Sequence, residues 1–224
     1  MKNWFRAAMA IFWKDILLET RTKDMLLAIL IFSILVIVIF NFAISPTPKM
    51  IGFVAPGILW VAFILGGMFG LTRSFGLERE GGALKGLLLA PVGRDAIFYG
   101  KMAAMFTLMM VVEVIVFPVF AVLFNLSLWI PWLIPVAALT TLGIATIGTV
   151  FSAIAMNTRA REIMFPLLFL PVAIPTIIAA VETSGVAIRG VELAEMSRWI
   201  PFMGAIDAVF LVICPVAFNL IIED

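Results

Sequence analysis

The chain has 224 residues, of which 64% are apolar and only 13% are charged, and its net charge is +1. A water-soluble domain carries about 45–50% apolar and about 25% charged residues, so this composition argues against an ordinary soluble fold. The net charge gives no broad basic surface for nucleic acid. The sequence has no histidine and one cysteine, Cys214. These counts exclude a disulfide within one copy, a CxxC site and histidine ligation of haem by this chain.

An N-terminal segment precedes the first apolar run. Within residues 1–24, Phe5, Met9, Phe12 and Ile16 fall on one helical stripe, whereas Arg6 lies away from it. This pattern is typical of a helix that lies in the cytoplasmic interface of a membrane. A membrane-entry helix without a specific partner is the alternative interpretation.

Six apolar runs predict six membrane-spanning helices. Each approaches or exceeds the roughly 20 residues needed to cross a hydrocarbon core of ~30 Å. Period-2 alternation is absent, which disfavours an outer-membrane barrel. The predicted spans are residues 25–44, 51–71, 102–124, 133–156, 163–181 and 200–222.

The distribution of positive charge predicts the orientation. With the N-terminus in the cytoplasm, twelve of the fifteen Lys and Arg residues fall in cytoplasmic segments. This split follows the positive-inside rule, and the opposite orientation would invert it. Six spans then place both termini in the cytoplasm. The prediction is a single all-α transmembrane domain over residues 1–224, with a cytoplasmic loop at 72–101 and an outside segment at 182–199.

The 72–101 segment is the longest charged stretch of the chain. Gly81 and Gly82 separate a charged part from a leucine-rich part that ends at Pro91. This arrangement predicts a helix–turn–helix at the cytoplasmic surface. Its apolar residues need a partner, which is either lipid or protein.

Two spans have unusual compositions. The fourth contains Thr140, Thr141, Thr146, Thr149 and Ser152, which indicates close helix packing and hydrogen bonds to backbone; a polar pathway is the rarer alternative. The fifth contains three prolines, at 166, 171 and 175. Each removes a backbone donor, so we expect this span to be broken and buried against protein.

Two carboxylic acids fall inside predicted spans. Glu113 lies near the middle of the third span and Asp207 about a third of the way into the sixth. An ionised carboxylate at the bilayer centre costs about 2.5–3.5 kcal/mol, so such a residue usually faces a bundle interior. The functional interpretation is a pathway or a conformational latch. The alternative is a protonated carboxyl hydrogen-bonded to a neighbouring Thr, Asn or backbone carbonyl.

No motif for catalysis is present. The chain lacks a P-loop and the sequence patterns of zinc proteases and serine hydrolases, so we expect no enzyme activity and no metal site. If the protein uses energy from ATP, a partner must bind the nucleotide.

Two stretches together form a recognisable pattern. The first stretch comprises Lys14-Asp15 and Glu19-Thr20-Arg21; the second comprises Phe75, Glu78, Glu80, Gly82-Ala83-Leu84, Leu87-Leu88-Leu89-Ala90-Pro91 and Gly100-Lys101. The pattern resembles the CcmB family, the membrane subunits of the haem-exporter ABC complex of bacterial cytochrome c maturation. Gly81 departs from it, because an acidic residue is common at that position.

The resemblance implies a type-2 ABC exporter permease in the bacterial inner membrane. Its partners would be a CcmA-like ATPase, CcmC-like and CcmD-like membrane subunits and a CcmE-like haem chaperone. ATP would bind the ATPase and haem would lie elsewhere in the complex, with no cofactor on this chain. ATP hydrolysis would be coupled to haem delivery or to release of the haem-loaded chaperone. A second copy of this chain or a different protein would complete the pair of permease halves.

The resemblance also implies the residues that couple the permease to the ATPase. A second cytoplasmic contact is expected at Arg159, Arg161 and Glu162, and the alternative for all these residues is a lipid-surface helix. The coupling residues are Arg73, Phe75, Glu78, Arg79, Glu80, Leu84, Leu87, Leu88, Pro91 and Arg94.

Three other functions remain open from the sequence. The first is a type-2 ABC permease for a drug, lipid or glycan. The second is an ATP-independent carrier that uses Glu113 or Asp207, although no inverted repeat is evident. The third is an assembly scaffold in which nucleotide turnover has no part.

Overall fold

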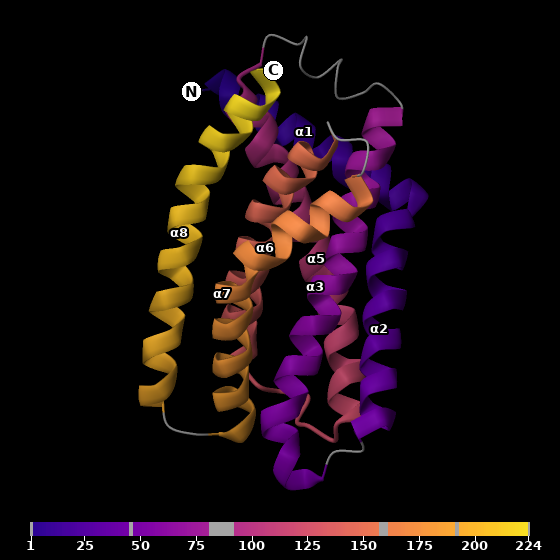
Figure 1. Ribbon diagram of the computed structural model, residues 1–224, viewed down its shortest axis with the longest axis vertical. Coiled ribbons are helices and arrows are strands. Elements are labelled where there is room, and N and C mark those ends of the chain that lie inside the picture. The colour runs from indigo at the N-terminus through magenta and orange to yellow at the C-terminus, as the bar shows by residue number, and fades with distance from the viewer. Residues whose placement is uncertain (1, 45–46, 81–91, 157–160, 191–192, 224) are drawn as a thin grey trace.

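The protein is a bundle of long helices (Figure 1). The computed structural model describes residues 2–44, 47–80, 92–156, 161–190 and 193–223, and none of these forms a β-strand. The helices are α1 (Lys2–Thr22), α2 (Asp24–Ile44), α3 (Pro48–Glu80), α5 (Arg94–Leu123), α6 (Leu133–Met156), α7 (Arg161–Arg189) and α8 (Leu193–Glu223).

Six of these helices are long and apolar enough to cross a membrane, which confirms the predicted fold class. One candidate span lies in each helix from α2 to α8. The spans are Asp24–Ile44, Met50–Thr72, Arg94–Leu123, Leu133–Ala155, Ile163–Arg189 and Arg198–Ile221. The chain is therefore a multi-pass membrane protein.

The spans run side by side along the long axis, and α1 crosses one end of the bundle (Figure 1). Both termini lie at that end, which we call the terminal end. α6 packs against α3, α5, α7 and α8 and so occupies the centre. Its Thr140, Thr146 and Thr149 are fully buried and donate hydrogen bonds to the carbonyl oxygens four residues earlier. The prediction of backbone-directed bonds in this span is confirmed.

The helices extend further than the apolar runs, and two predicted span boundaries were wrong, because the candidate spans run over Arg94–Leu123 and Ile163–Arg189 rather than 102–124 and 163–181. α3 continues to Glu80 and α5 begins at Arg94, so residues 72–80 and 94–101 are helical extensions of two spans. α7 continues to Arg189, and the expected outside segment at 182–199 is mostly helix. A hydropathy window locates the part of a helix that lipid surrounds, whereas hydrogen bonding continues the helix beyond it.

The expected break in the fifth span was also wrong. Pro166, Pro171 and Pro175 all lie inside one continuous helix, α7. Figure 1 shows that this helix changes direction along its length. Each proline bends a helix without ending it when neighbouring groups satisfy the freed carbonyls. Pro171 and Pro175 are exposed, so this helix presents part of its proline-bearing surface outward rather than burying it.

Candidate functional site at the terminal end

The predicted coupling residues lie within or beside residues 81–91, which connect α3 to α5. α3 ends and α5 begins at the terminal end, beside α1 and the end of α8 (Figure 1). The side chains of 73–80 and the positions Leu84, Leu87, Leu88 and Pro91 lie outside the described residues, as do Arg159 and the side chains of Arg161 and Glu162. Their contacts therefore stay predictions.

Arg94 is the predicted coupling residue whose side chain the structure places. Its Nη1 donates to the carbonyl oxygen of Asn219, at 3.3 Å. The Asn219 side-chain amide in turn donates to the carboxylate of Asp95. Arg94 and Asp95 thus join the start of α5 to the end of α8.

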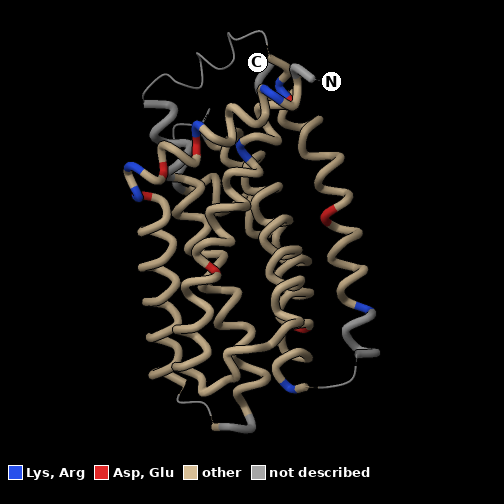
Figure 2. The backbone as a smooth tube through the Cα atoms, turned by 180° about the vertical axis from the view of Figure 1, so that it is seen from behind, with Lys and Arg blue, Asp and Glu red and all other residues tan. Residues whose placement is uncertain are grey.

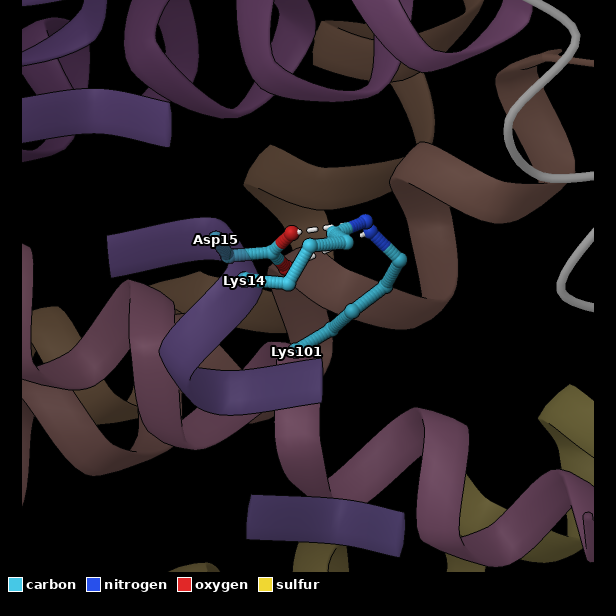
Figure 3. A network of polar contacts seen from close by, with 3 residues as sticks. All are labelled: Lys14, Asp15 and Lys101. Atoms are coloured by element: carbon cyan, nitrogen blue, oxygen red, sulfur yellow. Dashed lines mark hydrogen bonds and ion pairs between the residues drawn. The ribbon is translucent and has the colours of Figure 1, made fainter. Parts of the chain in front are cut away.

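A salt bridge holds α1 against α5. The ammonium of Lys101 lies 3.4 Å from Asp15 Oδ2, and the ammonium of Lys14 lies 2.9 Å from Asp15 Oδ1. Figure 3 shows the two lysines approaching the same carboxylate, from α1 and from α5. The Lys101 side chain is only 2% exposed, compared with 38% for Lys14. A buried ammonium needs a partner because its desolvation is costly.

The two residues before Lys101 extend this contact to a third helix. A Cβ on Gly100 would lie 2.7 Å from the Ala8 carbonyl oxygen and 2.9 Å from the Ile11 Cβ, so α1 passes directly over the glycine. The Tyr99 ring makes an edge-on contact with the Trp4 ring, at 5.7 Å between centroids. Its hydroxyl donates to the Leu211 carbonyl oxygen at 2.9 Å. We call Asp15, Tyr99, Gly100 and Lys101 the α1–α5–α8 clasp.

The sequence indicated this clasp only in part. Lys14-Asp15 and Gly100-Lys101 belong to the pattern that resembles the CcmB family, but nothing in the sequence paired them. One available signal was a lysine at the start of an apolar span together with an acidic residue on the amphipathic N-terminal helix. Each needs an opposite charge when the two helices pack.

Glu113 is placed in the bundle interior and is 5% exposed. The Thr141 hydroxyl of α6 donates a hydrogen bond to its Oε1, whereas Oε2 has no hydrogen-bond partner in the described part of the chain. A contact with a neighbouring Thr was one of the expectations for this residue, and a hydroxyl donor suits the charged and the uncharged acid alike. Glu113 thus joins α5 to α6.

Asp207 is also buried, at 3% exposed, and faces α6 and α7. Neither of its carboxyl oxygens has a hydrogen-bond partner among the described residues. Its Oδ1 lies 2.6 Å from the place that a Cβ on Gly143 would occupy, and Thr176 adjoins the same place. Glu113 approaches α6 at Thr141 and Asp207 approaches it at Gly143, so the two acids contact different faces of α6. Within the described ranges, no three Cys, Asp or Glu side chains gather closely enough to hold a metal ion.

The fold and these contacts define an all-helical membrane protein with six spans and an N-terminal helix fastened across one end. The sequence matches the family described as CcmB protein over residues 6–223. The chain belongs to the CcmB family.

Curated relatives of similar length support this assignment. A protein named Heme exporter protein B from Paracoccus denitrificans is 29% identical over 209 residues, which cover 93% of this chain and 94% of the relative. Its namesake from Rhodobacter capsulatus is 29% identical over 191 residues, or 84% and 85% of the two chains. The Escherichia coli K12 protein of that name is 36% identical over 73 residues, which are 33% of each chain.

Proposed function

We propose that this chain is the membrane subunit of a haem-export system for cytochrome c maturation. The observation that carries the proposal is membership of the CcmB family over almost the whole chain. The relatives that cover most of its length are named Heme exporter protein B. A transport subunit of this kind is a component of a larger assembly and is not itself an enzyme.

The orientation proposed for this subunit places the terminal end in the cytoplasm of a bacterial inner membrane. Arg6, Lys14, Arg21 and Lys23 lie on or beside α1 at that end, whereas Arg189 and Arg198 lie at the other. Figure 2 shows the concentration of charged residues at the terminal end and their scarcity along the spans. The positive-inside rule then assigns the terminal end to the cytoplasm.

The proposed energy source is a CcmA-like ATPase that docks at the terminal end. Leu84, Leu87 and Leu88 would enter an apolar groove of the ATPase, and Glu78, Arg79 and Glu80 would fix the register through charges at the rim. The helices that flank this segment, α3 and α5, both continue into the bundle. Movement of the segment would therefore be passed to two spans at once.

The α1–α5–α8 clasp would pass the movement of α5 on to two further helices. It fastens α1 and α8 to the first turns of α5. A load applied at the start of α5 would then reach three helices together. In this proposal ATP stays in the ATPase, and haem is handled by the complex that includes CcmC-like, CcmD-like and CcmE-like proteins. ATP hydrolysis would serve haem delivery or release of the haem-loaded chaperone.

Replacing both Leu87 and Leu88 by Asp tests the coupling. We expect the variant to insert normally but to lose most of its association with the ATPase, because two carboxylates would have to enter an apolar groove. The measurement is the amount of ATPase that copurifies, together with ATP turnover of the purified complex. Leu128→Asp, at the opposite end of the bundle, introduces the same kind of charge as a control. Normal ATPase association and turnover in the double variant would refute docking through these leucines.

A further inference from the structure

α1 turns a strip of large apolar side chains away from the bundle. Phe5, Met9, Trp13 and Leu17 follow one another at intervals of four residues, so they lie along one side of the helix. They are between 40% and 61% exposed, whereas Ile11, on the side that packs against α5, is 6% exposed. An exposed apolar strip of this kind marks a surface that contacts lipid or another molecule.

Contacts near both ends of α1 hold it at the level where two spans begin. Ala8 passes over Gly100, which lies in the second turn of α5. At the other end, Glu19 accepts a hydrogen bond at 2.8 Å from the amide of Leu26, in the first turn of α2. Because α2 and α5 are both candidate spans, α1 lies along the membrane surface at the terminal end, at the depth of the lipid headgroups.

The charges of α1 are sorted between its two sides. Both acids turn inward, since Asp15 lies against the buried Lys101 and Glu19 is 7% exposed. Arg6 and Arg21 are exposed, and neither guanidinium forms an ion pair with the described residues. The outward side of α1 therefore carries positive charge, and none of its described side chains adds negative charge there.

The two arginines lie at the two ends of the apolar strip. Arg21 follows Leu17 by four residues and continues the strip, and Arg6 lies beside it, three residues before Met9. Fifteen residues separate the two arginines, which is about 22 Å along a helix. An acidic phospholipid supplies a phosphate for such a guanidinium and acyl chains for the apolar side chains next to it.

We propose that the outward side of α1 binds acidic phospholipids at two positions. One phosphate group lies at Arg6 and the other at Arg21, and the acyl chains pack against Met9, Trp13 and Leu17. Trp13 lies between the two positions, where its ring occupies the boundary between headgroups and hydrocarbon. This surface depends neither on the ATPase nor on haem export, so it stands or falls separately from the function proposed above.

Quenching by brominated lipid tests the proposal. Cys214 is the one cysteine of the sequence, so Cys214→Ala provides a background in which a second substitution, Met9→Cys or Leu17→Cys, carries a single fluorescent label. The full-length chain, with the subunits that accompany it, is reconstituted at low salt into phosphatidylcholine bilayers that contain a minor fraction of phosphatidylglycerol. Bromine is placed on the acyl chains of one lipid or of the other.

We expect brominated phosphatidylglycerol to associate with both labelled positions about fivefold more strongly than brominated phosphatidylcholine, the usual effect of one arginine at an anionic surface. The preference should fall as salt is added, because salt screens exposed charges. Leu128→Cys places the same label on an exposed site at the opposite end of the bundle, and there the two lipids should quench equally.

Arg6→Gln and Arg21→Gln remove the same charge at different places, so each variant controls for the other. Arg6→Gln should abolish the lipid preference at position 9 and leave it unchanged at position 17. Arg21→Gln should do the reverse. The two effects are separable because about 22 Å is roughly twice the Debye length in 0.1 M salt, and misfolding would change both positions together.

Three outcomes would overturn the proposal. One is equal quenching by the two lipids at positions 9 and 17, which would mean that α1 does not select acidic lipid. Another is an unchanged preference at position 9 in Arg6→Gln and at position 17 in Arg21→Gln, which would place the selecting charge elsewhere. The third is absence of quenching by either lipid, which would mean that a protein subunit covers this side of α1.

Discussion

Replacing Asp15 by Ala is expected to lower the free energy of unfolding by about 3 kcal/mol, the usual cost of removing one partner of a buried ion pair. Asp15 Oδ2 lies 3.4 Å from the ammonium of Lys101, whose side chain is 2% exposed, and the substitution would remove this carboxylate from it. The measurement is denaturant unfolding of the purified chain in a mild detergent. Because α1 is held by this pair, the variant should also be cut faster by trypsin at Arg21 and Lys23.

Two further variants control for the loss of the side chain itself. Lys14→Ala removes the exposed partner of the same carboxylate and should cost less than about 1 kcal/mol. The double variant Asp15→Ala with Lys101→Met removes both buried charges and should recover part of the stability. If Asp15→Ala were no less stable than Lys14→Ala, Lys101 would not depend on Asp15.

Replacing Gly100 by Ala should displace α1 from α5. The added Cβ would meet the Ala8 carbonyl oxygen at 2.7 Å and the Ile11 Cβ at 2.9 Å, and the carbonyl is backbone that cannot rotate away. Overpacking of this kind costs about 1–3 kcal/mol. The expected results are a lower unfolding midpoint and a weaker Trp4–Tyr99 contact. Displacement of α1 should also be detected as faster tryptic cleavage between α1 and α2.

Gly57→Ala is the matched control. Gly57 also lies inside a helix, α3, but no atom lies within 4 Å of the place of its Cβ. Alanine favours a helix over glycine by about 0.5–1 kcal/mol, so this variant should be neutral or slightly more stable. Equal behaviour of the two variants would mean that the approach of α1 to Gly100 has no energetic importance.

Much of the fold could be predicted because the bilayer imposes strong rules on sequence. Six apolar runs located the six spans, and the threonines of α6 form the backbone-directed bonds expected of them. The ends of the helices could not be predicted from the apolar runs. Residues 94–101 are polar enough to resemble a loop, yet tertiary contacts of Tyr99 and Lys101 hold them in α5.

Less of the candidate site could be predicted. Glu113 could be recognised as a buried acid, but its partner could not, because α6 has several hydroxyl residues and only packing brings Thr141 to it. Asp207 likewise could be placed in a span but not beside Gly143. Pairing between distant segments, as between Asp15 and Lys101, depends on the rotation of each helix about its axis. Composition does not determine that rotation.

If this chain works as the membrane subunit of an ATP-driven haem-export complex, the other subunits of that complex should accompany it through purification. The tagged chain is purified from its native host in mild detergent, and the copurifying proteins are identified and quantified by mass spectrometry. We expect a stoichiometric P-loop ATPase together with CcmC-like and CcmE-like proteins. Absence of any ATPase, under conditions that keep a known ABC complex intact, would contradict it.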